Sequence, residues 1–291
     1  MTKETVLVLG LGEIGGTLFE LLKENKDKFE IYGLDLDSAK MKALGQNESK
    51  IPQNVETLHV CLPCSNRDVF MNTTVNYAKR FKPKLIIINS TVPPGTTMEI
   101  FAQCKCLVAH SPSRGVHRNS EYMKWEMKRW TKYVGGADPK SAIAACKHFK
   151  KMQLKVKRLK SCKETELAKL FETTYRAWMV ACFQEMHRIS RKFGAEFDET
   201  VDFLEDTHRI RFDRPIMFPG PIGGHCLIPN TELLLSVYDS DFLRLILSSN
   251  EKRKKEIKDK QIDAEVKKVK KRAETVQEEL MQTDAPPPES C

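Results

Sequence analysis

The stretch Val6-Leu7-Val8-Leu9-Gly10-Leu11-Gly12-Glu13-Ile14-Gly15 decides the fold of this 291-residue chain. An apolar run stands directly before three glycines in the spacing Gly-x-Gly-x-x-Gly, and residues 16–25 then carry leucines at helical spacing. A glycine triplet alone is a weak signal, because glycines gather in turns for many reasons. The order strand, glycine turn, helix is what favours a dinucleotide-binding fold here.

Each residue of the glycine loop has a separate role in this interpretation. Gly10 permits the tight turn, Gly12 lets a pyrophosphate approach the backbone, and Gly15 allows the helix to pack closely. Glu13 and Ile14 stand within the loop, and the N-terminus of the following helix offers N–H groups to the anion. We therefore expect these five residues to contact the cofactor.

Asp35 stands twenty residues beyond Gly15, at the end of the second expected strand. An acidic side chain at this place accepts hydrogen bonds from the ribose diol and repels a 2′-phosphate. The cofactor is therefore expected to be NAD rather than NADP. The alternative is a Rossmann-type fold that has lost its nucleotide.

Apolar runs alternate with helical or polar stretches over the first half of the chain. Strands are expected at residues 6–10, 30–35, 58–62 and 85–89, with further candidates at 107–111 and 132–135. This alternation predicts an α/β fold with a Rossmann-type, doubly wound parallel sheet and right-handed crossovers. We expect the NAD-binding domain to cover residues 1–160.

The pattern changes after the first domain. Residues 164–193 contain neither Gly nor Pro, and their apolar residues recur at three and four, which predicts one long helix. This helix opens a mostly helical domain, expected at residues 161–250. A charged helical tail is expected at 251–283, and the proline-rich residues 284–291 are expected to be disordered.

Apolar residues in the charged tail recur in alternating steps of four and three. They are Ile262, Val266, Val269, Ala273, Val276 and Leu280. This spacing predicts a coiled-coil seam of under three heptads. A solvated single helix that partly frays is the alternative.

Composition excludes several classes of protein. A hydrophobic content of 41% is near the globular norm and argues against disorder. The net charge of +9 comes largely from Lys/Arg runs at residues 147–160 and 253–271, which we interpret as solvated surface rather than a nucleic-acid site. No apolar stretch is long enough to cross a bilayer, and the first one begins too early for a signal peptide. A cytoplasmic protein is expected.

The nine cysteines lack the density of a secreted disulfide scaffold, so most are expected to be reduced. Cys61-Leu-Pro-Cys64 and Cys104-Lys-Cys106 raise the question of a metal or redox site. Because no second Cys-x-x-Cys follows, no metal is expected.

Four further segments resemble the UDP-glucose/GDP-mannose dehydrogenase family. They are Ser90-Thr-Val-Pro-Pro-Gly-Thr-Thr97, Tyr133-Val-Gly-Gly136, Glu166-Leu-Ala-Lys169 and Gly223-Gly-His-Cys226. The resemblance covers residues 4–250. It implies an NAD-dependent enzyme of polysaccharide biosynthesis that oxidises a primary alcohol of a nucleotide-linked sugar twice, to the acid. It also implies a homodimer built on the long helix.

The resemblance assigns roles to three residues in catalysis. It implies that Cys226 is the nucleophile, whose thiolate traps an aldehyde as a thiohemiacetal and then holds a thioester for water to hydrolyse. It implies that Lys169 is the active-site cation, which stabilises the oxyanion. Thr91 matches a family residue near the nicotinamide and the attacking water.

Four residues are expected near the substrate. Arg209 resembles a substrate-contacting arginine, although the register is off by one residue. One interpretation is that His225 lowers the pKa of the thiol of the neighbouring Cys226. The alternative is that His225 only packs within the loop. Thr173 and Asn230 stand where the family has Asn and Asp.

This sequence also departs from the family in other places. Ser111-Pro112-Ser113 replaces the family's Asn-Pro-Glu, so the carboxylate that assists acid–base steps is missing, and Arg114 and His117 stand nearby instead. General base catalysis therefore requires another residue. The glycine loop before Cys226 is one residue shorter than in the family. The charged tail stands where the family has a third, nucleotide-binding domain. Three explanations are open: the substrate is smaller, a second subunit contributes the missing surface, or the catalytic role has decayed.

Two other functions remain open. One is a one-step hydroxyacid-type dehydrogenase, since related Rossmann-plus-helix enzymes use a helix lysine without a cysteine. The other is a non-catalytic NAD-binding interaction protein, with the tail as its partner surface.

Overall fold

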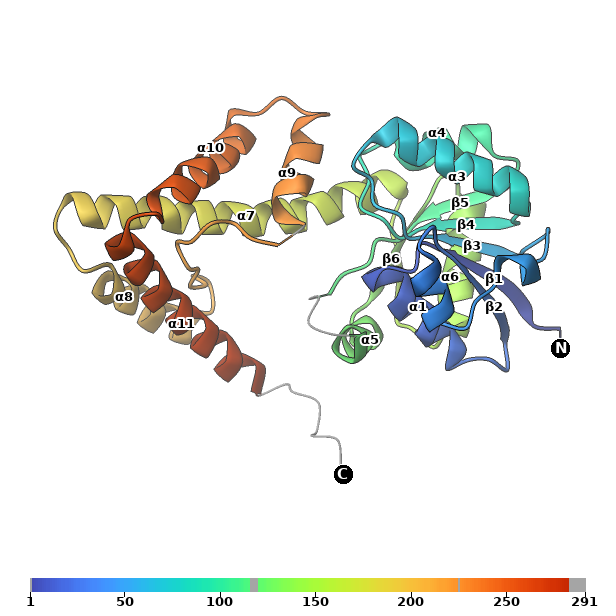
Figure 1. Cartoon of the computed structure of the whole chain (residues 1–291), viewed down its shortest axis with the longest axis horizontal. Coiled ribbons are helices and arrows are strands. Elements are labelled where there is room, and N and C mark those ends of the chain that lie inside the picture. Colours follow the sequence, from blue (N-terminus) through green and yellow to red (C-terminus); the bar gives the residue numbers. More distant parts are fainter. Residues whose placement is uncertain (1, 116–119, 225, 283–291) are drawn as a thin grey trace. The chain divides into compact units, whose positions relative to one another are not determined.

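The computed structural model describes residues 2–115, 120–224 and 226–282 (Figure 1). The chain divides into two compact units, Met1–Leu170 and Phe171–Cys291. The expected domain limits stay predictions, and the disorder expected for residues 284–291 lies outside the described residues.

Among the described residues of the first unit, seven strands form one sheet. They are β1 (Glu4–Leu9), β2 (Phe29–Leu34), β3 (Thr57–Val60), β4 (Leu85–Ile88), β5 (Leu107–His110), β6 (Lys132–Gly136) and β7 (Val156–Arg158). Their order is β2-β1-β3-β4-β5-β6-β7. All neighbours are parallel except β5 and β6, which are antiparallel. The Rossmann-type α/β fold is therefore confirmed, although β6 and β7 both run antiparallel to the other five strands, which the sequence pattern did not predict.

Helices connect the strands and cover both faces of the sheet (Figure 1). They are α1 (Glu13–Lys23), α2 (Ser38–Ala43), the short 3-10 helix η1 (Glu48–Lys50), α3 (Arg67–Phe81), α4 (Thr96–Gln103), α5 (Ser120–Arg129), α6 (Pro139–Lys151) and the start of α7 (Cys162–Lys192). On β1, Val6 and Val8 belong to the core cluster that includes α1 and α6, whereas Leu7 and Leu9 belong to the cluster that includes α3. This alternation follows from the two-residue period of a strand buried on both faces.

The carboxyl edge of the sheet is where a ligand is expected. β1 has β2 on one side and β3 on the other, so the strand order reverses at β1. Open α/β sheets bind ligands beside the carboxyl ends of the strands at such a switch point. The loop after β1 is the glycine loop, and it meets the start of the loop after β3 there, since Gly10 lies against Cys61.

The second unit is helical over its described residues. It contains the rest of α7, then α8 (Phe197–Arg211), α9 (Leu227–Leu235), α10 (Asp241–Glu256) and α11 (Lys260–Gln282). The apolar seam of the tail lies on α11, where Val266, Val269 and Val276 are buried. Val269 packs in one cluster with Phe183 and residues of α8. The seam therefore has a partner within its own unit.

No helix in the described ranges has both the length and the apolarity that crossing a membrane demands.

Candidate functional site at the carboxyl edge of the sheet

The glycine loop has a backbone that two of its glycines make possible. Gly10 has a φ of +86°, a left-handed conformation that favours glycine. A Cβ on Gly15 would lie only 1.7 Å from the carbonyl oxygen of Gly10, so this position excludes any side chain. A Cβ on Gly12, in contrast, would meet no atom within 4 Å. The fold itself therefore requires Gly10 and Gly15, whereas Gly12 keeps the space beside the loop open.

Helix α1 begins at Glu13, and its N-cap residue, Gly12, makes no side-chain cap hydrogen bond. The first turn of a helix carries N–H groups that cannot bond within the helix, and its dipole favours a negative charge. An uncapped helix start beside open space fits a pyrophosphate. Ile14 is half-buried in this first turn.

Asp35 connects the end of β2 to the glycine loop. Its Oδ2 accepts the N–H of Leu11 at 2.6 Å, and its Oδ1 accepts the N–H of Asp37 at 2.8 Å. A carboxylate has about four acceptor positions, so two remain for a diol. The half-buried Asp35 carboxylate, held beside the loop, fits the ribose of NAD.

The segment Ser90–Thr97 is held by a buried carboxylate on α7. Glu166 is fully buried, and its two oxygens accept the N–H of Gly95 at 2.8 Å and the N–H of Thr97 at 2.9 Å. Burial raises the pKa of Glu166, while these two bonds act in the opposite direction. Glu166, from the 166–169 motif, therefore caps helix α4, which begins within the 90–97 motif. This contact explains why the two motifs occur together. Thr91 lies half-buried in the same segment, after the carboxyl end of β4.

Lys169 follows Glu166 by three residues on α7 and is half-buried. Its charge contributes to lowering the pKa of His110 and of Lys132, so the three side chains share one electrostatic environment. His110, at the end of β5, is buried, and burial lowers its pKa to about 3. The ring bonds with Thr165 at 2.8 Å and with the carbonyl oxygen of Ser90 at 3.0 Å. His110 is therefore neutral and positions the start of α7 against the sheet.

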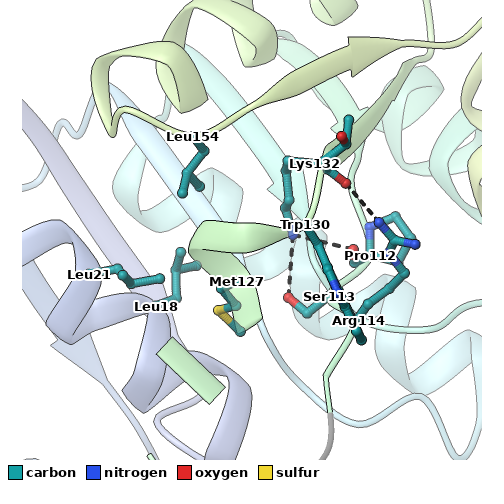
Figure 2. Close-up of a pocket in the computed structure, with 10 residues that line it drawn as sticks. Leu18, Leu21, Pro112, Ser113, Arg114, Met127, Trp130, Lys132 and Leu154 are labelled. Carbon is teal, nitrogen blue, oxygen red and sulfur yellow. Dashed lines mark hydrogen bonds between the residues drawn. The ribbon is translucent and has the colours of Figure 1, made fainter. Parts of the chain in front are cut away.

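The loop after β5 is bound to the start of β6 (Figure 2). Ser111 Oγ donates to the carbonyl oxygen of Tyr133 at 2.7 Å, and Lys132 Nζ lies 3.3 Å from the carbonyl oxygen of Pro112 and 3.4 Å from Ser113 Oγ. Arg114 donates to the carbonyl oxygen of Thr131 at 3.0 Å. The sequence pattern did not predict these contacts, because Lys132 stands in a charged segment where a lone lysine is normally solvated.

Arg114 is held by two rings as well as by this bond. Its guanidinium carbon lies 5.0 Å from the ring centre of Trp130 and 5.2 Å from that of Tyr133. Such stacking suits a guanidinium, which is planar and weakly hydrated. A cavity of about 20 Å³, large enough for one water molecule, lies between this loop and the α1 side chains Leu18 and Leu21 (Figure 2). His117 lies outside the described residues.

A chain of buried polar side chains, also missed by the sequence pattern, crosses the sheet. His148 Nδ1 lies 2.7 Å from Glu4 Oε1, the Nε2 atoms of His148 and His59 are 2.8 Å apart, and Asn89 Nδ2 lies 3.1 Å from His59 Nδ1. Burial alone would raise the pKa of Glu4, but the His148 contact holds it well below the ordinary value. Burial also lowers the pKa of His59. Asn89 Oδ1 is buried without a hydrogen-bond partner, so the chain ends with an unused acceptor at the carboxyl end of β4.

In the second unit, Cys226 is the N-cap residue of α9 and is half-buried. The loop before it is anchored at two backbone atoms. Gln184 Nε2 donates to the carbonyl oxygen of Gly220 at 2.7 Å, and Asn250 Oδ1 accepts the N–H of Ile222 at 2.7 Å. His225 lies outside the described residues.

Two residues that differ from the resembled family contact each other. Asn230 Nδ2 donates to Thr173 Oγ1 at 3.2 Å, and both residues are buried. The family has Asp and Asn at these positions, so the two replacements form one matched pair. Their role toward a substrate stays a prediction.

Arg209 lies on α8 and makes two ion pairs. Its guanidinium donates to Glu205 at 2.8 Å and to Glu279 of α11 at 2.8 Å. Its charge is therefore compensated within the unit, and its role as a substrate contact stays a prediction.

The cysteines of the Cys-x-x-Cys motif are neutral thiols. Burial raises the pKa of Cys61 to about 12 and that of Cys64 to about 11. Across the described part of the chain, His, Cys, Asp and Glu side chains form no group that could hold a metal ion.

Comparison with known proteins gives a family match over α7 to α10. Residues 163–252 match the family model described as "UDP-glucose/GDP-mannose dehydrogenase family, central domain". The resemblance to this family is confirmed. A UDP-N-acetyl-D-mannosamine dehydrogenase from Methanocaldococcus jannaschii is 27% identical over an alignment of 261 positions, gaps included, and the match covers 76% of this chain and 59% of that relative. The chain therefore matches little more than half the length of this relative of the nucleotide-sugar dehydrogenase family.

Solved structures show the same fold. A UDP-D-ManNAc dehydrogenase from Pyrococcus horikoshii superposes with a TM-score of 0.68 at 21% identity, covering 86% of this chain and 68% of that one. A 3-hydroxyisobutyrate dehydrogenase from Mycobacterium tuberculosis superposes with a TM-score of 0.64 at 15% identity, covering 89% of this chain and 95% of that one. At these identities the likeness concerns the fold alone.

Proposed function

We propose that this protein is an NAD-dependent dehydrogenase that oxidises a primary alcohol of a nucleotide-linked sugar to the acid. The family match over residues 163–252 carries this proposal, because that segment contains both Lys169 and Cys226. The uncapped helix start beside the open space at Gly12 supports the part of the proposal that concerns NAD binding.

The residues around the glycine loop would hold NAD. The N–H groups from Gly12 to Gly15 receive the pyrophosphate, Asp35 receives the ribose hydroxyls, and Thr91 lies toward the nicotinamide. When bound, NAD supplies a hydride acceptor for each of two oxidations.

Cys226 is the proposed nucleophile. It lies at the positive end of α9, a position that favours a thiolate. The thiolate sulfur adds to the aldehyde carbon formed in the first oxidation, and the resulting thiohemiacetal oxyanion loses a hydride to become a thioester. Water then breaks the carbon–sulfur bond, releasing the acid and the thiol.

Lys169 is the proposed cation of the reaction. Glu166 fixes the first turns of α7 to the 95–97 segment, so the helix that carries Lys169 is rigidly held. A preorganised cation stabilises negative charge that develops on the substrate oxygen.

We also propose a homodimer, located in the cytoplasm. In the second unit, α7 exposes three aromatic side chains at helical spacing, Phe171, Tyr175 and Trp178. The Trp178 ring lies 5.4 Å from that of Phe242, which is also exposed. An exposed aromatic face of this kind supports a protein partner, and a second copy of the chain is the partner proposed.

The test is a panel of nucleotide sugars, with NADH formation followed by absorbance. Wild type should form NADH and an acid with at least one member. Cys226→Ala should abolish acid formation, whereas Cys182→Ala, which removes another half-buried thiol, should leave it unchanged. Full activity of Cys226→Ala would contradict the covalent scheme.

One observation favours a second candidate, a one-step hydroxyacid dehydrogenase. The Mycobacterium tuberculosis 3-hydroxyisobutyrate dehydrogenase is matched over 95% of its length, and its fold therefore corresponds to nearly the whole of this chain. Turnover of small hydroxy acids, with none of nucleotide sugars, would support this candidate over the first.

A further inference from the structure

Lys132 is a lysine at an inward-facing position of the sheet. On β6 it shares a face with Val134, which is fully buried, because strand side chains alternate. Its Nζ lies over the Phe149 ring, 5.2 Å from the centre, and its polar contacts within the described part of the chain are Pro112 O and Ser113 Oγ. Neither atom carries a charge that compensates an ammonium group.

The charged groups around Lys132 are cations. No carboxylate among the described residues pairs with it. Arg114 faces it from the loop after β5 and Lys169 from α7, and both disfavour its ammonium form. Burial is the main cause that lowers the pKa of Lys132, to about 7, even though part of the side chain stays accessible.

The remaining titratable groups near Lys132 are neutral. His59 and Cys61 face it from β3 and its end, and His110 from β5. The low pKa of each histidine and the high pKa of the thiol leave all three uncharged near pH 7. Among the described residues, the charge that acts on Lys132 therefore comes from Arg114 and Lys169.

Ser113 lies beyond the carboxyl end of β5, beside Lys132. Its backbone N–H donates to the carbonyl oxygen of Asn89 at 3.2 Å, which places it beside the loop that contains Thr91. Ser113 also occupies the position where the resembled family has the acid–base glutamate. Its hydroxyl is within hydrogen-bond distance of an amine that has no counter-ion.

We propose that Ser113 and Lys132 form the proton-accepting pair of the oxidation, with the Ser113 hydroxyl toward the substrate alcohol and the Lys132 amine behind it. This inference rests on the proposed function. It supplies the general base that the missing glutamate leaves open. Ser113 is the catalytic residue of the pair, and Lys132 is a positioning residue that acts through it.

The hydroxyl proton of the alcohol moves to Ser113 Oγ while the proton of Ser113 moves to the lone pair of Lys132 Nζ. The carbon–oxygen bond becomes a carbonyl as the carbon–hydrogen bond breaks, and the hydride leaves to the nicotinamide of NAD. Lys132, now an ammonium, returns its proton to water before the next oxidation.

The first test compares variants of both residues in the full chain, with the nucleotide-sugar panel and NADH absorbance. Wild-type kcat should rise as the pH increases through about 7, because only the neutral amine accepts a proton. Lys132→Arg keeps a cation that cannot deprotonate, and it should lower kcat about 100- to 10,000-fold. Ser113→Ala should do the same, and Ser113→Thr should restore most of the rate. NAD affinity should stay within about twofold in every variant.

Lys157→Met is the matched control. Lys157 is an exposed lysine on the neighbouring strand β7, opposite Tyr133, and its loss should change neither kcat nor the pH profile. Wild-type kcat with an unchanged pH profile in Lys132→Arg would overturn the inference. If Lys132→Arg fails to fold, Ser113→Ala against Ser113→Thr decides, because neither substitution alters the buried amine.

The second test does not depend on activity. Lysine side-chain carbon resonances of the isotope-labelled protein are followed from pH 5 to 10, and the resonance absent from Lys132→Arg belongs to Lys132. A midpoint near 7 supports the pair, and a midpoint above 9 overturns it even in an active enzyme. If wild type binds NAD but turns over no substrate, the proposed function fails and the catalytic role of the pair fails with it, whatever the midpoint.

Discussion

Two loops at the carboxyl edge of one sheet are built in opposite ways. The glycine loop after β1 is determined by its own backbone, since a Cβ on Gly15 would lie 1.7 Å from an oxygen five residues earlier. The loop at Ser111–Arg114 is instead held by Lys132, which stands nineteen residues beyond Ser113. The first loop keeps a widespread motif, and the second departs from the family. The conformation of the first loop therefore depends on local backbone sterics, whereas that of the second depends on a side chain distant in sequence.

The largest expected effect separates the two kinds of glycine within the first loop. Gly15→Ala forces a carbon against the Gly10 carbonyl, so it should lower the free energy of unfolding by about 3 kcal/mol or more and abolish NAD binding. Gly12→Ala meets no atom, so it should fold normally but bind NAD more weakly. Urea unfolding and calorimetric titration with NAD measure both effects. Equal stability of the two variants would show that the loop is not sterically determined.

The second-largest effect is expected at Glu166, whose carboxylate holds the 95–97 segment. Glu166→Ala leaves the N–H groups of Gly95 and Thr97 without their acceptor, which should cost about 2–4 kcal/mol of unfolding free energy. Glu185→Ala, which removes an exposed carboxylate on the same helix, should change stability little. If the two variants unfold at the same urea concentration, Glu166 does not hold this segment.

Lys132, which holds the second loop, should make the free energy of unfolding depend on pH. Its folded-state pKa of about 7 is below its unfolded value of about 10.4, so between these values the unfolded chain binds more protons. Stability should therefore rise from pH 7 to 10, by at most about 1.4 kcal/mol per pH unit from this group. Lys132→Met should lack that rise and be more stable than wild type at pH 6. A wild-type curve that is flat from pH 7 to 10 would argue against the buried amine.

The stability contributed by the chain of buried polar side chains from Glu4 to Asn89 should respond to acid instead. The folded-state pKa of His59 is below its unfolded value of about 6.5, and that of Glu4 is below about 4.3. Stability from both groups is present above these unfolded values and is lost as the pH falls below them. Glu4→Gln should remove only the loss below about pH 4, as measured by urea unfolding from pH 3 to 8. An unchanged acid limb would show that Glu4 is not linked to folding.

The smallest effect on stability is expected at Arg209, whose ion pairs are exposed. Arg209→Ala should leave the melting temperature nearly unchanged. A rise in KM with constant kcat would support its predicted contact with the substrate, and unchanged KM would remove it from the site.

The parts of the fold that could be predicted are those with local causes. The strands and the glycine loop follow from runs of apolar residues and from glycine spacing, both read within about ten residues. Strand β7 was missed, because Val156–Arg158 is short and two of its three residues are charged. The motif at Glu166 was recognised, but its physical reason, a helix cap 70 residues away in sequence, required the structure.

The candidate site was predictable only in part, because some of its contacts join residues that are far apart in the sequence. Thr173 and Asn230 were predicted separately, as residues near the substrate. Their hydrogen bond to each other was not predicted, because a contact between residues 57 positions apart leaves no periodic signal. Lys132 carried no signal at all, since burial rather than residue type gives it its chemistry.

The double oxidation is measured most directly by counting NADH per molecule of nucleotide-sugar substrate consumed, with NAD in excess. Two NADH and one acid are expected for each substrate molecule. One NADH per molecule, with a carbonyl product, would contradict the double oxidation through Cys226, and no NADH with any substrate would contradict the dehydrogenase itself.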